Sequence, residues 1–252
     1  MSHTTDHEAA VRFAELAGQR LLEVRARAHH EGLRGSEVKD LGDHAAQTVL
    51  ARALAEGFPS DAVLSEEAAD DHTRLRAERV WIIDPLDGTR EFSEHGRDDW
   101  AVHVALWANG DLVAGAVALP ARSMTYSTNQ THPLPSRSVD APLRLAVSRS
   151  RPPEFVTGLA ERLGAHLVPM GSAGVKAMSV VDGECDAYVH AGGQYEWDSA
   201  APVAVARAWG LHTSRVDGSP LRYNNADPYL PDLVVARPEV ASRLLKALPD
   251  DR

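Results

Sequence analysis

Two long segments at the start of the chain carry apolar residues at helical spacing. Between Asp6 and His30 an apolar residue recurs every three or four positions, which places one stripe on one helix face. This stripe consists of Val11, Ala14, Ala17, Leu21 and Val24. Gly32 and Gly35 interrupt the pattern. A second helix is predicted from about Asp43, at the cap position, to Glu56.

The pattern then changes to short apolar runs and alternation, which is typical of strands. The predicted strands are 62–64, 80–83, 101–107, 112–119 and 124–128. Asn109-Gly110 between two of them is a hairpin signal. We therefore expect an antiparallel sheet in the first half of the chain.

Residues 129–142 are rich in Thr, Pro and Ser and are interpreted as the boundary between two halves, 1–135 and 136–252, of one structural unit. Beyond them strands and helices alternate, which predicts an α/β second half. The predicted strands are 143–147, 166–170, 185–190, 211–214 and 233–236, and the helices are 153–163, 171–181, 197–209 and 238–248.

The charge and the cysteine content of the chain restrict which partners and which kinds of site it can have. The formal net charge is −10, and the region from Asp61 to Asp99 is especially acidic. Such a surface repels nucleic-acid polymers and anionic membranes. The single Cys185 excludes an intrachain disulfide and is interpreted as a buried residue in a strand. With no apolar span and no signal-peptide core, we expect a cytoplasmic protein.

The segment WIIDPLDGTREF, from Trp81 to Phe92, carries the strongest chemical signal. Pro85 forces a turn directly after a buried strand, so Asp84 and Asp87 can converge on one point. Two such carboxylates repel each other unless a cation lies between them, and Mg²⁺ prefers oxygen ligands. Gly88 allows close backbone approach. The alternative is an Asp-rich solvated turn.

Other acidic residues are ambiguous when each is taken alone. Glu66 ends a short strand as one of a surface pair, and Asp43 and Asp198 stand near predicted helix starts. A helix N-cap is the ordinary role of such an Asp.

Taken together, WIIDPLDGT and WDSAA resemble the two signatures of the inositol monophosphatase superfamily, with LSEEA in the expected order before them. Within it, LDGTREF is similar to the LDGTKEF of the CysQ branch, the 3′-phosphoadenosine-5′-phosphate phosphatases. SRSRP, GSAGVK and GSPLRYN also look like segments of that branch.

The resemblance implies a layered α-β-α-β-α fold and a lithium-sensitive phosphatase with two or three Mg²⁺ per site, commonly a homodimer. It implies metal ligands at Glu66, Asp84, Asp87, Asp198 and the Leu86 carbonyl, and a water activated by Asp43 and Thr89. The chain departs from the family in having DLGD instead of VT-x-AD around Asp43. Lys39 or Arg34 stands in for an upstream lysine, and the choice between them stays open.

The expected substrate is 3′-phosphoadenosine 5′-phosphate, cleaved to AMP, or its sulfated relative. The loop before Trp197 lacks the Glu with which inositol phosphatases hold their sugar, and His190 and Glu196 occupy that neighbourhood. The proposed substrate contacts are Gly88, Thr89, Ser148, Arg149, Gly171, Ser172, Lys176 and Glu196. Alternatives are an inositol 1-phosphate or fructose 1,6-bisphosphate phosphatase and, more remotely, a non-catalytic nucleotide sensor.

Overall fold

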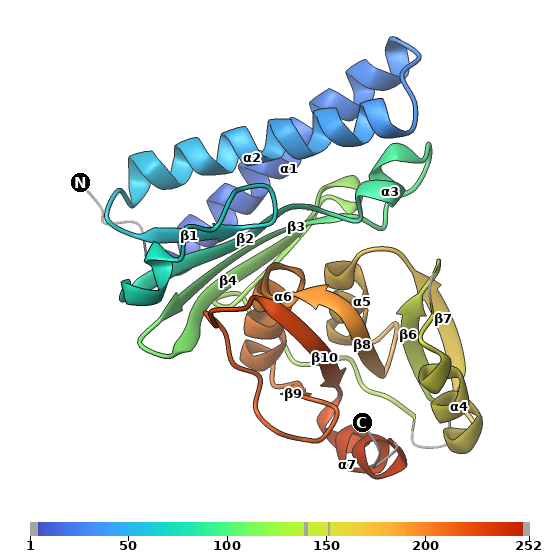
Figure 1. Ribbon diagram of the computed structural model, residues 1–252. Helices are drawn as coiled ribbons and strands as arrows, with labels where there is room; N and C mark the ends of the chain where they lie inside the picture. The colour runs from blue at the N-terminus through green and yellow to red at the C-terminus, as the bar shows by residue number, and fades with distance from the viewer. Residues whose placement is uncertain (1–4, 139–140, 151, 249–252) are drawn as a thin grey trace.

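The chain folds into five layers of alternating helices and sheets (Figure 1). The computed structural model describes residues 5–138, 141–150 and 152–248. The outer helical layer holds α1 (Asp6–His30) and α2 (Ser36–Gly57). The bounds of α1 are those predicted, whereas α2 begins seven residues before Asp43.

The first sheet has the strand order β1-β2-β3-β4-β5. Its strands are β1 (Ala62–Ser65), β2 (Arg79–Asp87), β3 (Ala101–Ala108), β4 (Asp111–Leu119) and β5 (Met124–Ser127). The meander from β2 to β5 is antiparallel, as predicted. However, β1 pairs with β2 in parallel, so the sheet is mixed. Short turns of helix, η1 (Thr73–Arg76), α3 (Thr89–Ser93) and η2 (Pro120–Arg122), connect the strands.

The second sheet has the order β7-β6-β8-β10-β9. Its strands are β6 (Arg144–Ser148), β7 (His166–Met170), β8 (Ala187–Tyr195), β9 (His212–Ser214) and β10 (Tyr229–Ala236). β8 starts two residues after Cys185, which is buried but lies outside the strand. The segment before Trp197, expected to be a loop, belongs to β8 up to Tyr195, and at its Gly192 and Gly193 the pairing with β10 is irregular.

Two helices separate the sheets, and two cover the outer face of the second sheet (Figure 1). α5 (Ala173–Val181) and α6 (Glu196–Ala208) form the central layer. α6 packs on β2, β3 and β4 of the first sheet as well as on β8 and β10 of the second. α4 (Glu154–Leu163) and α7 (Pro238–Ala247) form the last layer.

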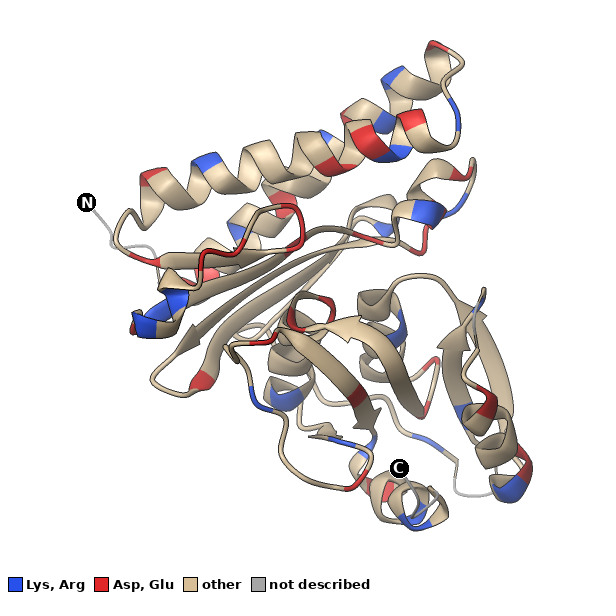
Figure 2. Ribbon diagram, viewed as in Figure 1, with Lys and Arg blue, Asp and Glu red and all other residues tan. Residues whose placement is uncertain are grey.

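Both sheets are therefore covered on both faces by apolar clusters. Their strands carry few charged residues (Figure 2), because an unpaired charge there would be desolvated, and Asp84 and Asp87 of β2 are exceptions. Among the described residues, no helix combines the length and apolarity needed to cross a membrane.

Candidate active site

Parallel pairing of β1 and β2 brings two acidic residues side by side. Ser65 pairs with Ile83, so the next residues, Glu66 and Asp84, follow at the same edge. The two groups interact, because the charge of Glu66 contributes to raising the pKa of Asp84. Asp84 is buried, and its Oδ1 accepts the Leu86 N–H at 3.0 Å. The turn expected directly after Asp84 is wrong, because β2 continues through Pro85 to Asp87, and Pro85 coincides only with a shift in the pairing with β3.

Asp87 and Asp198 join this pair from the end of β2 and the first turn of α6. One carboxylate oxygen each of Asp84, Asp87 and Asp198 lies within 4.8 Å of the others. Burial and then the charge of Asp87 raise the pKa of Asp198 to about 7. Burial and then Glu66 raise the pKa of Asp84 well above its usual value. Asp198 also accepts the Tyr195 N–H at 2.7 Å, so it caps α6 and belongs to the cluster.

This donor set fits a hard divalent cation. Three carboxylates from two halves of the chain face one another, and the raised pKa values of Asp84 and Asp198 show that burial and neighbouring negative charge disfavour their ionised forms. Glu66 is exposed as a whole residue, but desolvation of its carboxyl and the charge of Asp87 raise its pKa to about 7. Oxygen ligands of this kind suit Mg²⁺.

Asp87 is the one acid of the cluster that the protein itself holds ionised. Its Oδ2 accepts hydrogen bonds from the Ser172 hydroxyl and, at 2.7 Å, from the Gly174 N–H. His103 Nε2 lies 3.2 Å away. Burial opposes ionisation, but His103, Lys176 and Ser172 outweigh it and lower the pKa of Asp87 to about 2.

Sequence reasoning missed His103, although a lone His inside an apolar strand was a signal. It is fully buried and pairs across the sheet with Asp84. Gly174 makes room for it, because a Cβ at that position would lie 2.1 Å from His103 Nε2.

Asp43 and Thr89 meet on the other side of the turn. Asp43 is the eighth residue of α2, so the expected N-cap position is wrong. Its carboxylate hydrogen-bonds the Thr89 side chain, whose hydroxyl also lies 3.1 Å from the Leu86 carbonyl oxygen. Burial and then Glu67 raise the pKa of Asp43 to about 7.

The unusual DLGD stretch explains this approach of α2. A Cβ at Gly42 would lie 2.6 Å from Phe92 Cε1 and 2.8 Å from Leu86 Cδ2. Glycine therefore lets the helix pack directly on the turn that carries Thr89. Of the two candidate cations, Lys39 lies one helical turn before Asp43, and its charge opposes the rise of the Asp43 pKa.

A cavity of about 350 Å³ opens beside the acidic cluster. Its lining joins Asp87 and Asp198 to residues of the second half: Ser148, Ser150, Pro153, Ser172, Ala173, Lys176, Tyr188, His190, Ala191, Gly192, Gly193 and Gln194. Three of the predicted substrate contacts, Ser148, Ser172 and Lys176, are thus in its wall. Lys176 is buried, and its Nζ donates to the Ser172 carbonyl at 2.5 Å.

Gly88 and Gly171 have packing roles next to the cavity and are not in its lining. Gly88 has φ +87 and caps α3, and a Cβ on it would be 3.2 Å from Asp99 O and from Ser172 Cβ. Gly171 donates its N–H to Asp99 at 2.6 Å, and a Cβ on it would collide with Glu91. Both glycines let the two halves approach each other.

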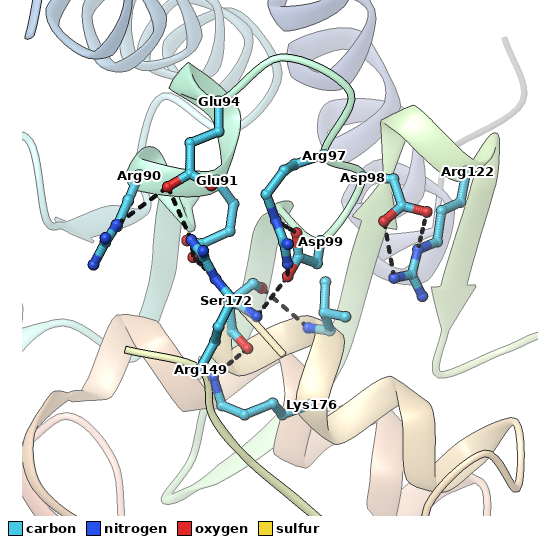
Figure 3. A network of polar contacts seen from close by, with 12 residues as sticks. Arg90, Glu91, Glu94, Arg97, Asp98, Asp99, Arg122, Arg149, Ser172 and Lys176 are labelled. Carbon is cyan, nitrogen blue, oxygen red and sulfur yellow. Dashed lines mark hydrogen bonds and ion pairs between the residues drawn. The ribbon is translucent and has the colours of Figure 1, made fainter. Parts of the chain in front are cut away.

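The guanidinium group of Arg149 already forms ion pairs with two carboxylates of the first half (Figure 3). Its NH2 group lies 2.7 Å from Glu91 Oε1 and 3.0 Å from Glu94 Oε1. Arg149 is not in the cavity lining, and direct binding of substrate by this residue stays a prediction. Arg151 of the SRSRP segment lies outside the described residues.

Glu196 is placed differently from the expectation of a substrate contact. It is fully buried, and its carboxylate accepts the Asn224 N–H at 2.7 Å and both the N–H and the side-chain amide of Asn225. Arg74, itself buried, donates to the Asn224 side chain and the Asn225 carbonyl. Glu196 thus fastens the start of α6 to the loop at residues 224 and 225, which Arg74 in turn links to the first half. A substrate contact by this buried carboxylate stays a prediction.

Comparison with known proteins agrees with this geometry. The model of the inositol monophosphatase family matches residues 3–250. A Mycobacterium tuberculosis protein named 3′-phosphoadenosine 5′-phosphate phosphatase is 54% identical over 241 residues, 93% of this chain and 90% of its own. The 3′(2′),5′-bisphosphate nucleotidase CysQ of Escherichia coli is 31% identical over 199 residues, 75% of this chain and 80% of its own.

Among solved structures, CysQ from Bacteroides thetaiotaomicron, described as a bacterial member of the inositol monophosphatase family, superposes with a TM-score of 0.79. The two chains share 26% sequence identity, over 94% of this chain and 98% of that one. Fold, acidic cluster and sequence point the same way. The chain belongs to the inositol monophosphatase family.

Proposed function

We propose that the protein is a Mg²⁺-dependent phosphomonoesterase that hydrolyses 3′-phosphoadenosine 5′-phosphate to AMP and phosphate. The observation that carries this proposal is that the acidic cluster and the cavity share residues. Asp87 and Asp198 belong to both, and Lys176 supplies a buried cation in the same cavity. The names of the relatives at 54% and 31% identity support a bisphosphorylated nucleotide as substrate.

Glu66, Asp84, Asp87, Asp198 and the Leu86 carbonyl are the proposed metal ligands. Divalent ions bound there would neutralise the phosphate and lower the pKa of the attacking water. The chain itself supplies the base. The Asp43 carboxylate, with a pKa of about 7, is half ionised near neutral pH and can take a proton from a water held beside the Thr89 hydroxyl.

A second group of residues would hold the remainder of the substrate. Lys176 places positive charge in the cavity, and Ser148 adds a hydroxyl group to its wall, whereas the Ser172 hydroxyl in the same wall donates to Asp87. Such groups stabilise the binding of a second phosphate, since charged hydrogen bonds contribute about 1.5–3 kcal/mol each. Inositol 1-phosphate has no second phosphate to use them. The sulfated relative of the nucleotide fits the same scheme.

The test is a comparison of kcat/KM for 3′-phosphoadenosine 5′-phosphate, inositol 1-phosphate and fructose 1,6-bisphosphate with Mg²⁺. We expect the nucleotide to be the best substrate and Asp84→Asn to abolish turnover of all three. A sugar phosphate that reacts faster would contradict the substrate assignment. Absence of any phosphate release would favour a nucleotide sensor.

Three finer properties are also proposals from family membership. Mg²⁺ should support higher turnover than Ca²⁺, because its smaller radius demands the tight oxygen geometry of a compact cluster. Lithium should inhibit by competing for one of the metal positions. A homodimer should appear in analytical ultracentrifugation, and a monomeric enzyme with full activity would refute that expectation.

A further inference from the structure

Gln194 is a buried residue of the cavity wall with unused hydrogen-bonding capacity. It is 6% exposed and lies in β8, directly before α6. Its Nε2 donates to the Tyr188 hydroxyl at 2.8 Å. Its Oε1 is buried and has no hydrogen-bond partner among the described residues. A buried polar atom without a partner is destabilising, so its retention in a cavity wall points to a ligand that supplies the partner.

The backbone places Gln194 next to the phosphate end of the cavity. The Tyr195 N–H donates to Asp198 Oδ2 at 2.7 Å, and that nitrogen is two covalent bonds from the Gln194 Cα. Asp198 belongs to the acidic cluster. Gln194 also lines the same cavity as Asp87 and Asp198, so a ligand group that reaches its carboxamide shares this cavity with the part of the ligand held at the acidic cluster.

The Nε2 atom of the carboxamide is held by the Tyr188 hydroxyl, while the Oε1 atom has no partner among the described residues. Tyr188 is fully buried and its ring also packs against Lys176, whose Nζ is 5.3 Å from the ring centroid. Because a phenol hydroxyl both donates and accepts, it can hold either end of the carboxamide. Gly192 and Gly193, just before Gln194, have φ of +79 and +72, and a Cβ on either would have no atom within 4 Å. No side chain of this bulge therefore opposes a small movement of Gln194 toward a ligand.

We propose that Gln194 hydrogen-bonds the hydroxyl on the carbon next to the scissile phosphate ester. In a nucleoside 3′,5′-bisphosphate this group is the ribose 2′-hydroxyl, and Gln194 makes the enzyme select ribonucleotides over 2′-deoxyribonucleotides. A hydroxyl both donates and accepts, so it matches either orientation of the carboxamide. The inference rests on the proposed function and adds to it the residue that recognises the sugar.

The test compares kcat/KM for the proposed substrate, 3′-phosphoadenosine 5′-phosphate (adenosine 3′,5′-bisphosphate), and for its 2′-deoxy analogue. The wild-type protein should prefer the ribonucleotide on the order of 5- to 100-fold, the range expected when a site built for a hydroxyl meets a substrate without one. Gln194→Met keeps the length of the side chain and removes the carboxamide. It should bring the ratio close to one by slowing the ribonucleotide and leaving the deoxyribonucleotide unchanged.

Two further variants separate recognition from structure. Tyr188→Phe keeps the ring beside Lys176 but removes the hydroxyl that anchors Gln194. It should therefore lower the preference for the ribonucleotide, by less than Gln194→Met does. If Gln194→Met fails to fold, Tyr188→Phe tests the inference in its place. Gln19→Met, at an exposed position of α1, is the matched control and should leave the ratio unchanged. Dissociation constants of the two nucleotides, measured by calorimetry in an Asp43→Asn background, should show the same loss of preference.

An equal effect of Gln194→Met on both nucleotides, or a wild-type protein without preference, would overturn this inference and leave the proposed function standing. If neither nucleotide is hydrolysed while a sugar phosphate is, the proposed function fails and the inference fails with it.

Discussion

Replacing Asp198 by Asn should stabilise the metal-free protein while removing its response to metal. Burial and the charge of Asp87 raise the pKa of Asp198 from 3.8 to about 7. Between these two pH values the folded protein binds a proton more tightly than the unfolded chain does. The free energy of unfolding therefore falls as pH rises through this window, and at pH 8 the full penalty is present. An Asn at this position carries no such penalty.

The size of the effect follows from the same shift. Three pKa units correspond to about 4 kcal/mol as an upper limit. Asp198 is only half-buried, so solvent screens part of this energy, and we expect a gain of about 1–3 kcal/mol at pH 8. For a chain of this size, each kcal/mol raises the melting temperature by roughly 2–4 °C.

Thermal unfolding in EDTA and in excess Mg²⁺ measures both consequences. Asp198→Asn should melt higher than wild type in EDTA and gain little from Mg²⁺, whereas a saturating ligand at 100 times its Kd stabilises the wild type by about 2.7 kcal/mol. Asp198→Ala is the control, because it also removes the acceptor of the Tyr195 N–H, a loss of about 0.5–2 kcal/mol. If Asp198→Asn melts at or below wild type in EDTA and still responds fully to Mg²⁺, the charge-repulsion argument is wrong.

Three other substitutions test the roles of residues around the cluster. Asp43→Asn should lower kcat by about 10²–10⁴-fold without lowering the melting temperature, because Asp43 is no helix cap, and near-normal kcat would place the base elsewhere. Glu196→Gln should lower the free energy of unfolding by about 1–3 kcal/mol in urea titrations, since an NH₂ group would face donors of Asn225, and an unchanged midpoint would contradict this role. Arg149→Ala should reduce kcat/KM by a similar factor for every substrate, because Arg149 ties α3 to the second half, and a loss confined to the nucleotide would instead support direct phosphate binding.

The sequence was most informative where one local pattern carries both structure and chemistry. The apolar stripe predicted α1, and the DPLD stretch predicted that Asp84 and Asp87 converge, although β2 continues through Pro85 to Asp87 instead of ending in a turn. Contacts between distant segments were beyond local patterns. The pairing of Arg149 with Glu91 depends on how α3 packs against the second half. His103 and Gly174 likewise become neighbours of Asp87 only after the sheet and α5 have come together.

The central position of α6 has a consequence for how the chain can be divided. By sequence α6 belongs to the second half, yet it covers β2, β3 and β4 of the first sheet. A fragment ending at residue 135 would leave that apolar face in water, and the complementary fragment would carry a helix without its second docking surface. We therefore expect the two halves to depend on each other for solubility. The boundary at residues 129–142 would then divide the polypeptide without dividing the folding unit.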